Sequence, residues 1–239
     1  MNSGDSREVK VGKTIRLAGS AIELVALGKR EPDALADFLQ QFVFGASLGL
    51  DLWVETYKAL GLESEFRQVD RLVFPEDKNL WFLPMVPGVT SNKIVAGHRR
   101  FGVNYWLYAD DLDVSVPTHD RDANRDGPYI VGFRRNVEAD EEFAGKSVNV
   151  LVKAGHKGIC LPERLLLGAG YHVATGQHLD VKTATLCAGS HSVGGIVPHV
   201  DWSSGNRKVY VNHRNPDNSD GSLRSRSAVS YVSCLHSKA

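Results

Sequence analysis

Residues 160–170 read CLPERLLLGAG, and they predict the start of a helix in the second half of the chain. Pro162 suits a first helical position, where its missing N–H is not needed. The negative charge of Glu163 suits the positive end of the helix dipole. Gly168 and Gly170 weaken the middle of the helix, so we expect it to be either short or closely packed.

Two helices are predicted upstream, from apolar residues at helical spacing. The first begins at Pro32 and ends at Gly45, and the second covers about residues 47–60, with Gly61 as a left-handed stop. Their apolar stripes are Leu35, Phe38, Leu39 and Phe42 in the first helix, and Leu50, Trp53, Val54 and Tyr57 in the second. A helix on a sheet must bury such a stripe, so we interpret both as core.

The rest of the chain changes from helical to strand-like patterns. Strands and turns are predicted where short apolar segments, at Trp81 and Phe82 and at residues 105–108, are separated by Pro84, Pro87, Gly88 and Gly97. Residues 129–133 are a further strand candidate. Val148, Val150 and Val152 alternate with polar residues, which predicts a strand with one face in water. Helices first and strands later indicate an α+β fold.

Composition excludes several classes of protein. The 239 residues include 28 basic and 28 acidic side chains, so no excess of Lys and Arg indicates a nucleic-acid partner. The cysteines, Cys160, Cys187 and Cys234, are too few for a disulfide framework and indicate a reducing compartment. We see no secretory signal in the first thirty residues and no run of about 20 apolar residues. These features predict a soluble, cytoplasmic protein without a membrane span.

Residues 122–127 read DANRDG and match the first half of a calcium loop, with Asp122, Asn124 and Asp126 as candidate ligands. Phe133 occupies the place of the closing glutamate, although Glu138, Asp140, Glu141 or Glu142 could supply an irregular ligand. The same residue types also form ordinary polar turns. The nine histidines show no metal-ligand spacing. We therefore expect no metal and no cofactor, with calcium as an alternative.

Residues 190–194 read SHSVG and come close to the nucleophile elbow of hydrolases. Ser192 takes the nucleophile position, and Asp201 and His213 follow in a hydrolase-like order. The elbow requires a helix directly after the nucleophile, whereas Gly194, Gly195 and Pro198 make a helix improbable. We expect a binding protein rather than an enzyme, with a Ser192 hydrolase as an alternative.

The strongest signal is the composition of residues 190–231. Ser, Asn, His, Asp, Gly, Arg and Tyr make up 29 of these 42 residues, against 73 of the other 197, and Glu, Gln, Met and Thr are absent. Such a segment could be a disordered tail. Apolar residues recur through it, however, and predict short strands that anchor polar loops, which is the geometry of a recognition surface. They are Ile196, Val197, Val200, Trp202, Val209, Val211, Leu223, Ala228, Val229 and Val232.

This segment resembles the variable region of proteins encoded by diversity-generating retroelements. Adenine-specific mutagenesis of AAC and AAT codons yields Asn, Asp, His, Tyr, Ser, Gly and Arg, but not Glu, Gln, Lys, Met or Trp. By that rule Trp202 and Lys208 belong to the invariant framework, whereas Tyr210 fits either set. Residues 160–163 with Leu165 and Leu166 are similar to a helix start in the same family, and residues 223–229 look like its closing strand.

The resemblance implies a C-type lectin fold, often of the formylglycine-generating-enzyme type, with short, mainly antiparallel strands. It implies a hypervariable ligand-binding protein. A broad polar patch suits an interface better than a deep small-molecule pocket, so we expect the partner to be a protein of unknown identity. We predict a helical N-terminal part over residues 1–78, packed on a lectin-like domain over residues 79–239. A calcium-dependent lectin is a further alternative. The expected ligand-binding residues are the polar ones between framework anchors: His191, Ser192, His199, Asp201, Ser203, Ser204, Asn206, Asn212, His213, Arg214, Asn215, Asn218, Ser219, Asp220, Ser222 and Ser227.

Overall fold

The computed structural model describes residues 50–67, 74–75, 77 and 79–233. All of them belong to one compact unit, Gly45–Ala239. The helix predicted between Pro32 and Gly45 lies outside the described residues. The predicted boundary after residue 78 falls inside this unit.

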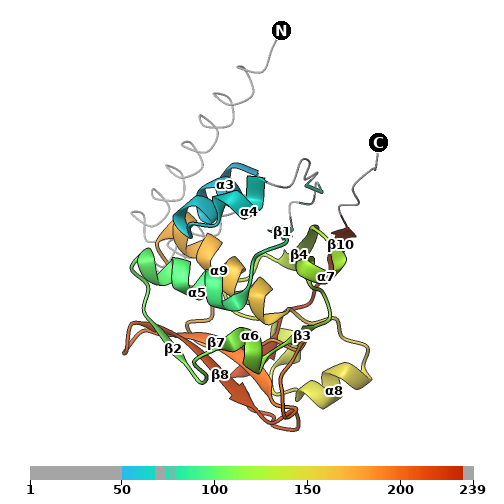
Figure 1. Ribbon diagram of the computed structural model, residues 1–239. Coiled ribbons are helices and arrows are strands. Elements are labelled where there is room, and N and C mark those ends of the chain that lie inside the picture. The colour runs from blue at the N-terminus through green and yellow to red at the C-terminus, as the bar shows by residue number, and fades with distance from the viewer. Residues whose placement is uncertain (1–49, 68–73, 76, 78, 234–239) are drawn as a thin grey trace, which may run out of the picture. The chain divides into compact units, whose positions relative to one another are not determined.

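The order of elements confirms an α+β fold (Figure 1). The helices are α3 (Leu50–Ala59), α4 (Glu63–Arg67), α5 (Ser91–Arg100), α6 (Leu112–Ser115), α7 (Ala123–Asp126), α8 (Val148–Lys153) and α9 (Leu161–Thr175), with a 3-10 turn, η1 (Glu141–Phe143). The strands are β1 (Leu80–Met85), β2 (Tyr105–Leu107), β3 (Thr118–His119), β4 (Tyr129–Arg134), β5 (Ala184–Leu186), β6 (Ser190–His191), β7 (Val197–Ser203), β8 (Lys208–Arg214), β9 (Leu223–Ser225) and β10 (Ser230–Ser233). Among the described residues, no helix has the length and apolar character needed to cross a membrane.

The strands form three sheets. Their orders are β1-β4-β10, β2-β8-β7-β5-β9 and β3-β6. Most neighbouring strands are antiparallel, but β2–β8 and β5–β9 are parallel. Pro84 lies within β1 rather than between strands, and it is tolerated there because β1 is an edge strand that needs fewer N–H donors.

Helix α9 is the centre of the described unit and contacts α3, α5, β1 and β7. It starts where Pro162 and Glu163 predict, and the Glu163 carboxylate accepts the backbone N–H of Cys160 at 2.8 Å. The helix is fifteen residues long and therefore not short. Of the two alternatives for the effect of Gly168 and Gly170, close packing is confirmed. A Cβ added at Gly170 would lie 2.8 Å from Cζ3 of buried Trp53, which shows how closely α3 approaches.

The second predicted helix is present as α3, but its buried face differs from the predicted stripe. Trp53 and Tyr57 are fully buried, whereas Leu50 and Val54 are 47% and 43% exposed. Leu52 takes their place in the core. The Trp53 indole donates to the carbonyl of Phe82 at 2.9 Å, so the helix is fixed to β1 by a polar contact as well as by packing.

Two predictions of extended structure were wrong. Val148, Val150 and Val152 lie in α8, where Val148 and Leu151 are buried and Val150 and Val152 are more than half exposed. Burial therefore follows the helical spacing of three, and the Ser147 side chain caps the helix by accepting from the N–H of Val150. Tertiary packing overrides the weak helix propensity of valine here.

Gly97, predicted to separate strands, instead lies inside α5. Thr90 caps this helix by accepting from the N–H of Lys93. A Cβ at Gly97 would lie 2.3 Å from the carbonyl oxygen of Leu60, so a glycine is needed for α5 to approach the end of α3.

Candidate ligand-binding surface

The segment predicted to be variable forms an antiparallel pair of strands, β7 and β8, followed by a loop and β9 (Figure 1). Val200 and Val211 face each other in the register and are fully buried, and Val209 and Leu223 are buried as well. The predicted anchoring of polar loops by short apolar strands is confirmed for residues 197–225. This part of the chain is therefore ordered by the core and is not a disordered tail.

The structure leaves most of the sixteen predicted binding residues accessible. Nine are exposed: His191, Ser204, Asn206, Arg214, Asn215, Asn218, Ser219, Asp220 and Ser222. Six are half-buried: Ser192, Asp201, Ser203, Asn212, His213 and Ser227. His199 is only 4% exposed, because β5 and β8 flank it on both sides in the sheet. Burial lowers its pKa to about 4, and we assign His199 to the framework instead of the surface.

These residues do not gather at one place. The largest group lies on the β7–β8 hairpin and its turn. The following loop lies against α8, where the Asn149 side chain donates to Asp217 at 2.5 Å. His191 contacts Asp120 at 2.9 Å beside β3. Ser227 is bound by its backbone N–H to Asp140 and is separate from the hairpin surface.

A buried ionic network holds the end of the segment predicted to be variable. Arg226, 1% exposed, donates to Asp180 at 2.6 Å and to the carbonyls of Asn136 and Val137. Arg164 of α9 donates to the other oxygen of Asp180 at 2.8 Å. The two guanidinium groups lower the pKa of Asp180 against the opposing effect of its burial. Residues 223–229 are thereby tied to the core.

Trp202 is held in place by ring stacking, as we expect for a residue of the invariant framework. Its ring stacks on His178 with centroids 3.5 Å apart, and His178 stacks on His172 at 4.5 Å. His172 contacts His98 of α5 at 3.1 Å through ring nitrogens, and the Tyr105 hydroxyl lies 2.8 Å from the other His98 nitrogen. Burial lowers the pKa of His98 and His178 to about 3, so this row of rings is uncharged at neutral pH.

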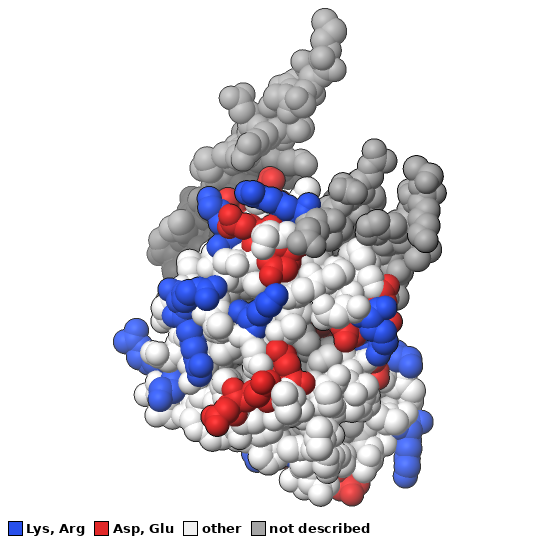
Figure 2. Space-filling model, viewed as in Figure 1, with Lys and Arg blue, Asp and Glu red and all other residues white. Residues whose placement is uncertain are grey.

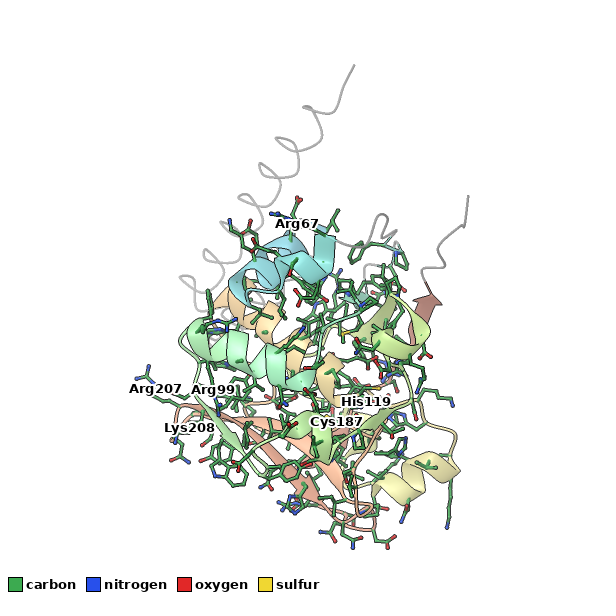
Figure 3. The ribbon with its side chains drawn as sticks, in the orientation of Figure 1. Arg67, Arg99, His119, Cys187, Arg207 and Lys208 are labelled. Carbon is green, nitrogen blue, oxygen red and sulfur yellow. The ribbon has the colours of Figure 1, made fainter. Side chains whose placement is uncertain are left out.

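Sequence reasoning missed a group of residues at the edge of the same sheet. Trp106 of β2 lies opposite Tyr210 of β8, and their rings stack with centroids 5.5 Å apart. Figure 3 shows Arg99, Arg207 and Lys208 close to this edge. We name Trp106, Arg207, Lys208 and Tyr210 the basic–aromatic patch. A parallel pairing between strands a hundred residues apart has no local sequence signal that could have predicted it.

The calcium-loop residues serve other purposes. Asp122 caps α7 by accepting from the N–H of Asn124, and Asn124 accepts from the N–H of Gly88 at 2.7 Å. Asp126 pairs with Arg125, which lowers the pKa of its carboxyl. The Glu138 carboxylate accepts backbone N–H groups of residues 181–183. Within the described ranges no three His, Cys, Asp or Glu side chains are grouped so that they could hold a metal ion.

The residues of the hydrolase alternative are not arranged as a triad. The Ser192 hydroxyl donates to the carbonyl of Ile196, and the chain then enters strand β7 instead of a helix. Nδ1 of His213 is buried without a hydrogen-bond partner. His119 contacts a different serine, Ser190, at 2.8 Å, and that serine is only 1% exposed.

The cysteines are equally unsuited to nucleophilic chemistry. Cys160 and Cys187 are buried free thiols, and Cys234 lies outside the described residues. Burial is the largest effect on both described thiols and raises their pKa well above the ordinary range, which keeps them protonated.

Comparison with known proteins yields no relative: no family model, no curated protein and no solved structure matches the chain.

Proposed function

We propose that the protein is a hypervariable ligand-binding protein of a diversity-generating retroelement, built on a C-type-lectin-like scaffold, and that it has no catalytic activity. The observation that carries this proposal is the arrangement of residues 197–225. Buried anchors fix the backbone of the hairpin, while the polar residues between them stay accessible. A surface of this kind can change its side chains without changing its fold.

The shape of the site favours a protein as ligand. The accessible residues spread over the hairpin, its turn and the following loop, and do not converge on a pocket. The cavity lined by Met85, His119, Arg121 and Tyr129 measures about 110 Å³, whereas pockets for drug-sized molecules measure roughly 300–1,000 Å³. Broad polar surfaces that contain aromatic residues and arginine are typical of protein interfaces.

Scaffold rigidity explains how such a surface could bind tightly. Side chains on a preordered backbone lose less conformational entropy on binding than side chains on a flexible tail. The fixation of Trp202 by stacking and of Arg226 by Asp180 supplies this rigidity on both sides of the accessible residues.

The test of the proposal has a genetic part and a biochemical part. The gene should lie near a reverse transcriptase gene and a second copy of the codons for about residues 190–231, differing at adenines. In the protein, simultaneous substitution of Ser204, Asn206, Asn215, Asn218 and Ser219 should leave the melting temperature nearly unchanged. The matched control replaces Ser190, Ser225 and Thr185, which belong to the same polar types but are buried, and this variant should unfold.

A library that varies the accessible positions should then yield binders to an arbitrary protein target. A locus without the second codon copy would contradict the retroelement origin. Loss of folding in the accessible-site variant would contradict the separation of surface and scaffold.

A further inference from the structure

The basic–aromatic patch has cations that are available to a ligand. Arg207 and Lys208 form no ion pair with any carboxylate in the described part of the chain, whereas Arg121, Arg125, Arg134, Arg164 and Arg226 all do. Arg99 on α5 lies on the other face of β2, where its guanidinium donates to the carbonyl of Tyr105 at 3.4 Å and lies 6.0 Å from the centre of the Tyr105 ring. Figure 2 shows separate groups of blue side chains along this edge of the molecule.

The aromatic part of the patch is fixed and accessible. Trp106 is 41% exposed although it stacks on Tyr210, and the Asn206 amide donates to the Tyr210 hydroxyl at 2.9 Å. Lys208 and Tyr210 are two residues apart on β8, so their side chains leave the same face of the sheet. Trp106 lies opposite Tyr210 and shares that face. The indole therefore offers an apolar contact beside a lysine.

The positive region is short. Four residues after Trp106 the chain reaches Asp110 and Asp111, and Asp113 follows on α6. Figure 2 shows a red band over α6. A nucleic-acid strand carries a charge at every nucleotide and would run from the cations onto these carboxylates. A short acidic peptide segment can contact the cations without reaching these carboxylates, and so avoids that repulsion.

We propose that the basic–aromatic patch binds a short acidic segment of the protein target, with two carboxylates on Arg207 and Lys208 and an apolar side chain on Trp106. This inference rests on the proposed function, because the patch extends the hairpin surface and identifies the chemistry of its partner. Lys208 and Trp106 lie outside the variable set, so this preference for acidic segments persists while neighbouring side chains change.

Binding is measured by fluorescence anisotropy with the full chain and a fluorescein-labelled probe of alternating Glu and Gly, eight residues long. A Gln–Gly peptide and an eight-nucleotide oligothymidylate serve as comparison probes. The double variant Arg207→Glu, Lys208→Glu should weaken binding of the acidic peptide about tenfold, because two attractions become repulsions. The matched control is Lys153→Glu, Lys157→Glu, two exposed lysines outside the patch, and it should change binding less than twofold.

The inference is overturned if the Gln–Gly peptide binds equally well, or if the Arg207, Lys208 variant retains full affinity while its melting temperature is unchanged. Equal or tighter binding of oligothymidylate would assign the patch to nucleic acid instead. Asn218→Ala, Ser219→Ala should leave peptide binding intact but alter binding to a target selected from the library. If the acidic peptide does not bind but the selected target does, this inference alone is wrong. If the acidic peptide binds but the selected target does not, the proposed function is wrong.

Discussion

Acidification should destabilise the protein through histidines that the fold keeps uncharged, and His98 is the clearest case. It is 1% exposed, and burial is the largest cause of its low pKa, followed by the neighbouring His172 and His178. The unfolded chain binds a proton at this histidine below pH 6.5, but the folded protein does so only near pH 3. Stability is therefore fully present above pH 6.5 and is lost as the pH falls below that value.

The size of the effect follows from this difference in proton binding. Between pH 7.5 and pH 5, a histidine with a folded pKa of about 3 loses about 2 kcal/mol of stability. His199, with a folded pKa of about 4, loses about 2 kcal/mol more. Together these losses are a large part of the roughly 5–15 kcal/mol that stabilises a typical domain.

Other groups around His98 modify this effect. Arg164 on α9 adds positive charge near His178, which opposes protonation of that ring. Asp201 on β7 acts in the opposite direction, because burial raises the pKa of its carboxyl, so the folded protein takes up a proton there more readily than the unfolded chain. Its protonation offsets part of the loss as the pH falls.

The assay is urea unfolding of the full chain at half-unit steps between pH 7.5 and pH 5. The free energy of unfolding should decline by about 1 kcal/mol per pH unit from His98 alone near pH 5.5. His98→Phe keeps a ring at this position but removes the titrating group, so its decline should be shallower by that amount. The matched control is Phe101→Leu, which disturbs the same cluster without removing a histidine, and it should lower stability equally at every pH. An unchanged slope in His98→Phe would refute the reasoning.

Four further substitutions test the fold by urea unfolding. Arg226→Ala should reduce the free energy of unfolding by about 3–5 kcal/mol, because the buried Asp180 carboxylate loses one of its two arginine partners; a loss under 1 kcal/mol would show that the network does not stabilise the fold. Gly170→Ala should destabilise by roughly 1–3 kcal/mol through contact with Trp53, despite the better helix propensity of alanine, and a more stable variant would contradict the close approach. Leu151→Ala should destabilise by about 2–5 kcal/mol and Val150→Ala by less than 1 kcal/mol, whereas a buried alternating strand requires the opposite order.

Local signals predicted some elements correctly because their causes are local. Pro162 and Glu163 determine where α9 starts through the first helical turn, without help from distant residues. The alternation of valines at 148–152 misled because it fits a strand, whereas burial of Leu151 and capping by Ser147 decide for a helix. Gly97 misled in the same way. A glycine is needed there because the backbone of Leu60, directly after α3, lies too close for a Cβ atom.

The proposed binding surface was likewise predictable only where its causes are local. Its polar composition and its anchors are visible in the sequence, because the apolar residues of β7 and β8 recur at strand spacing. The contribution of Trp106 depends on a parallel pairing between β2 and β8, and His199 is buried only because β5 and β8 flank it. Such long-range pairings depend on the whole fold, so a single sequence does not encode them in any short segment.

Magnitudes explain why this hairpin can tolerate variation. A substitution at an exposed position away from caps and ion pairs changes stability by about 0.5 kcal/mol in either direction. Over the exposed predicted positions other than His191, which pairs with Asp120, such changes partly cancel and sum to about 1–2 kcal/mol. Loss of the buried ion pair between Arg226 and Asp180 alone lowers stability by more than that sum. Under the proposed function, selection can therefore act on the ligand contacts of many variants while a few buried anchors keep all of them folded.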